Sequence, residues 1–215
     1  MKRTTSAVCG LFSGLLILAS GTQSANASLI FTESFEDPAT GGLTNVVPTG
    51  WIDLGSDMGI NTNSAARFTT PFGSQVAWAN APRQLQTSAA ILSDTLAAGM
   101  VYTLSFNVAR RTDLAGSYLV ELMAGTSILA SATGMPSFTD FSETDQIVFT
   151  ADGSHTALLG ETLSIRIGTG LDEAVQPQFD NFQLTAAVPE ASEALVVLVG
   201  MTGLLGDRRR RRQSR

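Results

Sequence analysis

The chain has 215 residues, with 13 basic and 19 acidic side chains, one histidine and one cysteine. This length allows one large all-β domain, or one ordinary domain with processing segments. A single cysteine excludes an intramolecular disulfide and a cysteine-rich zinc site, and a single histidine excludes a histidine cluster. The formal net charge of −6 argues against nucleic acid as a general partner.

The charge is distributed unevenly along the chain. Eight of the 13 basic residues lie within the first three and the last eight positions. Residues 28–187 hold 16 acidic residues against five arginines and no lysine, which gives a formal charge of −11. We therefore divide the chain into residues 1–27, a domain at residues 28–187, and residues 188–215.

Residues 1–27 have the features of a secretory signal peptide. Lys2 and Arg3 precede an apolar run at residues 7–19, and Ala25-Asn26-Ala27 supplies the small side chains that signal peptidase accepts. The run is too short for a stable membrane span, although an uncleaved anchor is the alternative interpretation. Cleavage would remove Cys9 and leave the exported chain without a thiol.

Residues 28–187 are predicted to form an all-β, jelly-roll-like antiparallel β-sandwich. Short β-rich runs are separated by clusters of Gly, Pro, Asn and Asp. In the clearest run Tyr102, Leu104 and Phe106 alternate with polar side chains, the pattern of a strand with one buried face. The strands expected in this way cover residues 29–35, 51–54, 75–79, 90–96, 100–109, 118–124, 128–133, 146–150, 163–167 and 179–186.

Two carboxylates at opposite ends of this domain stand out. Glu36 closes the first expected strand, and Asp180 lies in the last one. Because Asp180 alternates in register with Phe182, we expect it to point toward the core, where a carboxylate is costly unless it is paired or coordinated. One interpretation needs no ligand: Glu36 caps a turn, and Asp180 pairs with an arginine such as Arg166.

The segments around these carboxylates resemble a known metal site. Phe35-Glu36 and the run from Phe179 to Leu184 are similar to the structural calcium site of galactose-binding-like and carbohydrate-binding-module β-sandwiches. The resemblance implies a calcium ion held by Glu36 and Asp180. Main-chain carbonyls would have to complete the six to eight oxygen ligands that calcium takes.

The aromatic residues offer a candidate ligand-binding position at Trp51. This residue follows Pro48-Thr49-Gly50 at a loop exit, where its ring could line a rim and stack on a sugar. Core packing is nevertheless the favoured interpretation for all four aromatic residues considered: Trp51, Trp78, Tyr102 and Tyr118.

No catalytic motif is recognisable. His155 lies in a turn by composition, and no G-x-S-x-G segment accompanies it. Two carboxylates that act together on a glycosidic bond stay possible, because their separation in space is not visible in a sequence. We therefore expect a protein that is not an enzyme.

Residues 188–215 combine three features in a fixed order. Val188-Pro189-Glu190 is followed by an apolar run at residues 194–206 and then by Arg208, Arg209, Arg210, Arg211 and Arg212. A helix over that run would be about 20 Å long, which makes a marginal membrane anchor with the arginines as a stop signal. A basic tail that binds nucleic acid is the alternative, and the signal-peptide-like start argues against it.

The order of these features resembles the PEP-CTERM sorting signal, with Val188, Pro189 and Glu190 as the recognition motif. The resemblance implies export in a Gram-negative bacterium, transient anchoring in the inner membrane and cleavage by an exosortase. The protein would then act at the cell surface or in the extracellular matrix, as a structural or carbohydrate-binding module with extracellular polysaccharide as a partner. A glycan-acting hydrolase with an undisclosed carboxylate site is the alternative.

Overall fold

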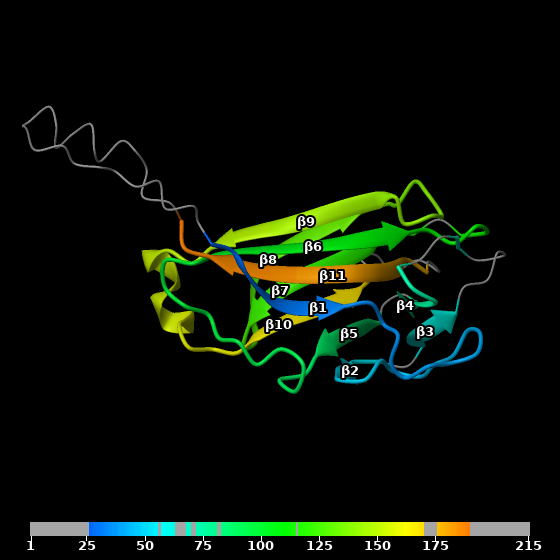
Figure 1. The fold of residues 1–215 in the computed structure, drawn as a ribbon, viewed down its shortest axis with the longest axis horizontal. Helices are drawn as coiled ribbons and strands as arrows, with labels where there is room; N and C mark the ends of the chain where they lie inside the picture. Colours follow the sequence, from blue (N-terminus) through cyan, green and yellow to red (C-terminus); the bar gives the residue numbers. More distant parts are fainter. Residues whose placement is uncertain are drawn as a thin grey trace, which may run out of the picture.

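The computed structural model describes residues 26–55, 57–62, 68–69, 72–80, 83–114, 116–169 and 176–189. These residues form strands and one short 3-10 helix, η1, at Gly153–Leu158 (Figure 1). The strands are β1 (Ser28–Glu33), β2 (Trp51–Asp53), β3 (Met58–Thr62), β4 (Gln75–Ala79), β5 (Gln84–Thr87), β6 (Val101–Ala109), β7 (Tyr118–Ala124), β8 (Ser127–Gly134), β9 (Glu143–Thr150), β10 (Leu163–Gly168) and β11 (Gln178–Ala187).

The strands make two antiparallel sheets. The first sheet has the order β3-β4-β11-β6-β9, and β1 also pairs with β11 (Figure 1). The second sheet has the order β2-β5-β10-β7-β8. We call the face of the first sheet that is turned toward the second sheet its inner face, and the opposite face its outer face. The predicted all-β antiparallel β-sandwich is confirmed.

The main hydrophobic core fills the space between the two sheets. Phe182 from β11 lies at its centre: its ring stacks on Phe106 with centroids 5.2 Å apart and meets Phe35 edge-on at 5.8 Å. Tyr102 is 2% exposed, as the alternation predicted, and its hydroxyl donates to the carbonyl of Thr95. Such aromatic contacts add to the stabilisation that burial of apolar area provides.

A second, smaller cluster packs on the outer face of the first sheet. It consists of Phe68, Val76, Ala109 and Phe141, and the rings of Phe68 and Phe141 meet edge-on at 5.8 Å. The main chain of Thr69 donates to the carbonyl of Thr139, which ties the segment with Phe68 to the segment with Phe141. One part of the outer face is therefore covered by loops and not by another sheet.

Some strand predictions were wrong. Residues 90–96 form a turn and an extended segment with a single bridge from Thr95 to Thr162, and their buried Leu92 and Leu96 pack into the core. The strands β3 and β5 were not predicted. Glycine interrupts the alternation in β3, and β5 carries two glutamines on the face away from the core.

The prediction that Asp180 points toward the core was also wrong. The pairing of β11 with β6 shifts register between Asp180 and Gln183, and Asn181 in this bulge has a φ of 51°. A β-bulge adds one residue to a strand and so reverses the alternation of faces beyond it. Phe179 and Phe182 both lie in the inner core, whereas Asp180 lies on the outer face.

The flanking segments lie largely outside the described residues. The described chain begins at residue 26 and ends at Pro189, so Glu190, the apolar run and the arginine cluster are not described. Among the helices of the described part, none is long and apolar enough to cross a membrane. The proposed boundaries at residues 27 and 187 stay predictions.

Candidate active site

The candidate site lies where β11 leaves its pairing with β4 and begins its pairing with β1. Gln178 and Phe179 pair with β4, and residues from Phe182 onward pair with β1. The bulge at Asp180–Gln183 falls at this change of partner. Asp180 is thereby placed on the outer face, opposite Asn107 of β6.

Asp180 is a fully buried carboxyl group with few donors. It is 0% exposed, and its two oxygens accept from the main-chain N–H of Phe72 at 2.7 Å and of Asn181 at 2.7 Å. Burial raises the pKa of Asp180 to about 7, because a desolvated carboxylate is unfavourable. The two N–H groups work against this rise, and the negative charges of Glu36 and Glu33 add to it. Asp180 can therefore hold or release a proton near neutral pH.

Glu36 binds the same short segment, residues 72–75, that covers Asp180. Its carboxylate accepts from the main-chain N–H of Ser74 at 2.8 Å, from the Ser74 hydroxyl at 2.9 Å and from the main-chain N–H of Gln75 at 2.9 Å. Gly73 has a φ of +126°, and a Cβ there would approach the Glu36 carboxylate to 2.2 Å. Glu36 caps this turn, which is the interpretation of the sequence that needs no metal.

Trp51 does not lie on an exposed rim. Its side chain is 6% exposed, its ring lies 5.4 Å from that of Phe35, and its Nε1 donates to the Glu33 carboxylate at 3.2 Å. A ring packed in this way has no free face for a sugar. The core packing favoured for both tryptophans is what the structure shows: Trp51 is buried, and so is Trp78, at 1% exposed.

The expected partner of Asp180 is engaged elsewhere. Arg166 of β10 donates through Nε to Glu121 of β7 at 2.5 Å, in the second sheet. No ion pair to Asp180 is found among the described residues. His155 lies in η1 beside Asp152 at 2.9 Å and packs against Phe149, as part of a helix cap.

Asn107 links this region to the neighbouring loop. Its Nδ2 donates to the carbonyl of Phe141 at 2.8 Å and to the Thr144 hydroxyl at 2.8 Å, and its Oδ1 accepts from Asn181 at 3.0 Å. Both ends of the Asn107 amide are thus used. They hold the bulge that sets the direction of Asp180.

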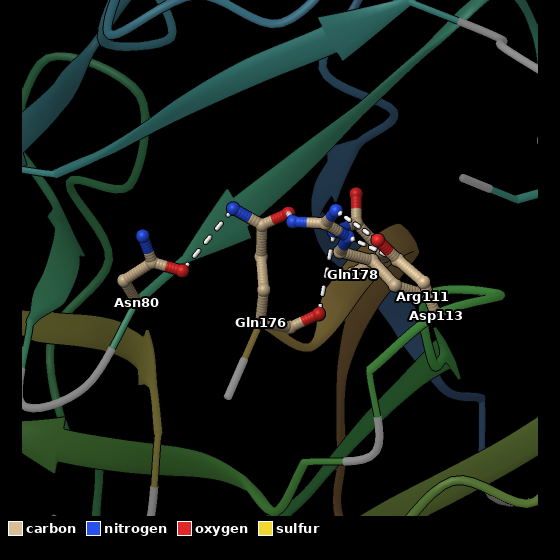
Figure 2. Close-up of polar contacts among 5 residues, drawn as sticks. All are labelled: Asn80, Arg111, Asp113, Gln176 and Gln178. Carbon is tan, nitrogen blue, oxygen red and sulfur yellow. Dashed lines mark hydrogen bonds and ion pairs between the residues drawn. The ribbon is translucent and has the colours of Figure 1, made fainter. Parts of the chain in front are cut away.

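A polar network continues from this face to the end of the sheet. Figure 2 shows Gln176 between Asn80 and Arg111: Gln176 donates to Asn80 at 3.1 Å and accepts from Arg111 at 2.8 Å. Arg111 also makes a two-point contact with Asp113, at 2.9 and 2.7 Å. Gln178 donates from Nε2 to the carbonyl of Gln176 at 3.4 Å.

Metal ligation by side chains alone is not supported. Within the described residues no group of three or more His, Cys, Asp or Glu side chains could hold a metal ion. Glu36 and Asp180 are brought to one segment, residues 72–75, but by themselves they supply only two carboxylates. Calcium at this position would depend on main-chain carbonyls.

A shallow hollow of about 430 Å³ lies along β1, lined by Leu29, Ile30, Phe31, Thr32, Glu33 and Ile91. Only Glu33 among these residues carries a charge, and its oxygens already accept from the N–H groups of Ser34, Phe35 and Trp51. The hollow offers apolar contact without a free catalytic group.

Comparison with known proteins decides the family. The sequence model of the HpiC1-like family, described as HpiC1 cyclase, matches residues 27–185. The chain belongs to the HpiC1-like cyclase family. No curated protein matches the sequence.

Solved structures of cyclases from Fischerella sp. TAU share the fold. The Stig cyclase Fisc, in complex with (3Z)-3-(1-methyl-2-pyrrolidinylidene)-3H-indole, is 24% identical with a TM-score of 0.64. The match covers 77% of this chain and 100% of that one. A second cyclase, in complex with 4-(1H-indol-3-yl)butan-2-one, is 23% identical with a TM-score of 0.63, over 74% of this chain and 96% of that one.

Family membership corrects several predictions. The PEP-CTERM assignment was wrong, because the family that matches residues 27–185 is one of cyclases. The expectations of a sorted structural or carbohydrate-binding protein, and of a protein that is not an enzyme, were wrong for the same reason. Signal peptidase, exosortase and polysaccharide were partners inferred from those assignments and are withdrawn with them. Export itself stays a prediction.

The sequence pointed to Asp180 and Glu36 but missed the polar residues around them. Nothing in the sequence distinguishes Gln176, Gln178 and Asn61 from ordinary polar residues of strands and loops. A weak signal was present in β11. The even-numbered positions are polar at Gln178 and Asp180, but apolar from Phe182 onward. That change of phase indicates a bulge.

Proposed function

We propose that this protein is a cyclase that closes a ring in a small, largely apolar molecule bearing a nitrogen heterocycle such as indole. Membership of the HpiC1-like family supports the reaction class. The indole compounds held by the Fischerella cyclases support the substrate class. The observation that carries the proposal is the buried Asp180 carboxyl group, whose pKa is raised to about 7.

Asp180 is suited to proton transfer at neutral pH. A general acid works best when its pKa lies near the pH at which it operates. In our proposal the Asp180 carboxyl gives its proton to one carbon of a substrate alkene, and the adjacent carbon becomes cationic. A nucleophilic carbon of the same molecule attacks that centre and forms the ring bond. Loss of a proton from the new ring to the Asp180 carboxylate then restores the acid, so the reaction is an isomerisation without an external oxidant or reductant.

The surroundings of Asp180 favour this chemistry. The main-chain N–H of Asn181 stabilises the carboxylate that forms after proton transfer, whereas the N–H of Phe72 is the contact that an entering substrate would replace. The Phe72 side chain is 47% exposed, so the cover between Asp180 and solvent is thin at this point. A substrate would reach Asp180 by displacing the main chain at Phe72.

The test is the conversion of 3-alkenylindoles to isomers of unchanged mass, followed by liquid chromatography and mass spectrometry. Asp180→Asn keeps the shape of the side chain but removes the proton, and we expect at least a hundredfold loss of rate. The wild-type rate should fall as pH rises through about 7, because the acid form is lost. Asp94→Asn, at an exposed carboxylate, is the matched control and should leave the rate unchanged. Equal rates for wild type and Asp180→Asn would contradict the proposal.

Calcium is a second candidate role for the same carboxylates. Asp180 and Glu36 interact electrostatically, and a cation between them would offset burial and like charge. No step of the proposed reaction passes through such an ion. Thermal unfolding in millimolar calcium and in chelator tests it: a higher Tm that Glu36→Gln abolishes would support calcium, and an unchanged Tm would exclude it.

A further inference from the structure

Two buried amide side chains near Asp180 carry polar atoms without a hydrogen-bond partner. Asn61 of β3 and Gln178 of β11 are both 0% exposed. Neither Oδ1 nor Nδ2 of Asn61, nor Oε1 of Gln178, has a partner among the described residues. A buried polar atom without a partner costs about 1–3 kcal/mol, and native proteins contain few of them. Such atoms therefore call for a ligand or another functional explanation.

Strand register places both amides on the same face as Asp180. Gln178 pairs with Trp78 and Ala109, and Asn61 pairs with Val76. Val76 and Ala109 belong to the outer cluster, so their cross-strand partners also lie on the outer face. Gln178 precedes Asp180 by two residues, which in a strand is a separation of about 7 Å along one face. One small molecule can span this distance.

The orientation of the Gln178 amide is set by its neighbours. Its Nε2 donates to the carbonyl of Gln176, so Oε1 is the end without a partner. Gln176 is in turn held by Asn80 and Arg111 (Figure 2). The network thereby leaves an acceptor, which selects a hydrogen-bond donor.

We propose that Gln178 Oε1 accepts a hydrogen bond from a ring N–H of the substrate, and that Asn61 provides a second polar contact on the same face. This inference rests on the proposed cyclase function, because it places the substrate between Gln178 and Asp180. It specifies the substrate further: the ring nitrogen of the heterocycle must carry a hydrogen atom that it can donate. A site built around such an acceptor rejects analogues that lack the donor.

Gln75 shows, by contrast, how a buried amide that holds the fold together is hydrogen-bonded. Gln75 is also buried, at 2% exposed, but its Oε1 accepts from the N–H and the hydroxyl of Thr40, and its Nε2 donates to the carbonyls of Phe35 and Pro38. Its amide is fully used in holding loops. Gln178 lies two residues before Asp180 on β11, and Asn61 lies on β3, two strands from β11 in the sheet. Neither Oε1 of Gln178 nor the amide of Asn61 has such partners.

The experiment measures binding of two probes by calorimetry. The first is 4-(1H-indol-3-yl)butan-2-one, and the second is its benzofuran analogue, in which oxygen replaces the ring N–H. We expect wild type to bind the indole probe about tenfold or more tightly than the benzofuran. Gln178→Met should bind both probes equally. Gln84→Met, a half-buried glutamine of the second sheet, is the matched control and should keep the wild-type ratio.

Stability gives an independent readout. Replacing an unpartnered amide with an apolar side chain of similar size removes a desolvation cost, so Gln178→Met and Asn61→Leu should keep or raise the Tm. A Tm lowered by several degrees would show that the amides serve the fold and would overturn the inference. An unchanged indole preference in Gln178→Met, or a wild type that binds neither probe, would also overturn it.

Failure of the proposed function is distinguishable from failure of this inference. Asp180→Asn should lose turnover and keep the preference for the indole probe. A wild type that shows the Gln178-dependent preference but converts no 3-alkenylindole would retain the inference and remove the proposed reaction. A wild type that converts 3-alkenylindoles and the corresponding benzofurans at equal rates would retain the proposed reaction and remove the inference about Gln178.

Discussion

The two faces of the first sheet differ in what they bury. The inner face buries a continuous set of apolar side chains, with Phe182 in contact with Phe35, Trp51, Phe106 and Phe179. The covered part of the outer face buries Asn61, Gln178 and Asp180 beside a small apolar cluster. A fold gains nothing from unpartnered buried polar atoms, and this is why our proposal places the active site on the outer face.

The largest expected loss of stability comes from a change on the inner face. Phe182→Ala removes the ring at the centre of the core and should lower the free energy of unfolding by about 3–5 kcal/mol. Urea unfolding measures it. A loss below about 1 kcal/mol would mean that the inner face is not the source of stability. Phe182→Leu, which keeps most of the volume, should lose considerably less.

The second prediction separates partnered from unpartnered amides. Gln75→Leu leaves the N–H of Thr40 and the carbonyls of Phe35 and Pro38 without partners, and should cost about 3 kcal/mol. Asn61→Leu should cost nothing by the same measurement. Equal losses in the two variants would remove the distinction between the faces.

The third prediction concerns pH and stability. The pKa of Asp180 is about 7 in the folded protein, above its usual value of about 3.9 in an unfolded chain. The unfolded carboxyl therefore loses its proton first, and folding stability should fall as pH rises from about 4 to about 7. The stabilising contribution is complete below pH 4 and lost above the folded pKa.

The comparison that isolates this term uses Asp180→Asn. Its stability should vary less between pH 4 and 8 than that of wild type, by about 2–4 kcal/mol in urea unfolding. Parallel pH curves for the two proteins would show that Asp180 titrates normally in the folded state. Asp94→Asn should follow the wild-type curve.

The smallest effect concerns the turn that covers the site. Gly73→Ala places a Cβ against the Glu36 carboxylate and at a φ that favours glycine, and should cost about 1–3 kcal/mol. The same change should weaken binding of the indole probe, because a strained turn shifts the main chain at Phe72, past which the probe would reach Asp180. Gly99→Ala, at a positive φ of +73° with open space around it, measures the cost of a positive φ without a contact such as that with Glu36.

Sequence patterns predicted the sandwich because its inner faces follow strict alternation. Residues 100–109 and 163–167 were placed almost as β6 and β10 have them. β3 was missed because Gly59 and Asn61 break the pattern. Both residues lie on the outer face: a Cβ at Gly59 would meet the main chain at Thr44, and the Asn61 side chain is buried there without a hydrogen-bond partner among the described residues.

The site was predictable only in part. Asp180 and Glu36 were identified as unusual carboxylates, but the bulge that turns Asp180 outward depends on pairing with β6 and β1. Gln178 carries no signal of its own in sequence, because its significance lies in having no partner. The enzymatic class was missed because a single buried acid forms no motif.

The most direct test of this account is the pKa of Asp180, measured by carboxyl ¹³C NMR in the presence of a chelator, with and without 4-(1H-indol-3-yl)butan-2-one. We predict a titration midpoint near 7 in the free protein and a shift of the Asp180 signal when the indole ketone is added. A midpoint near 4, together with a signal that the indole ketone leaves unchanged, would contradict the placement of the active site at Asp180.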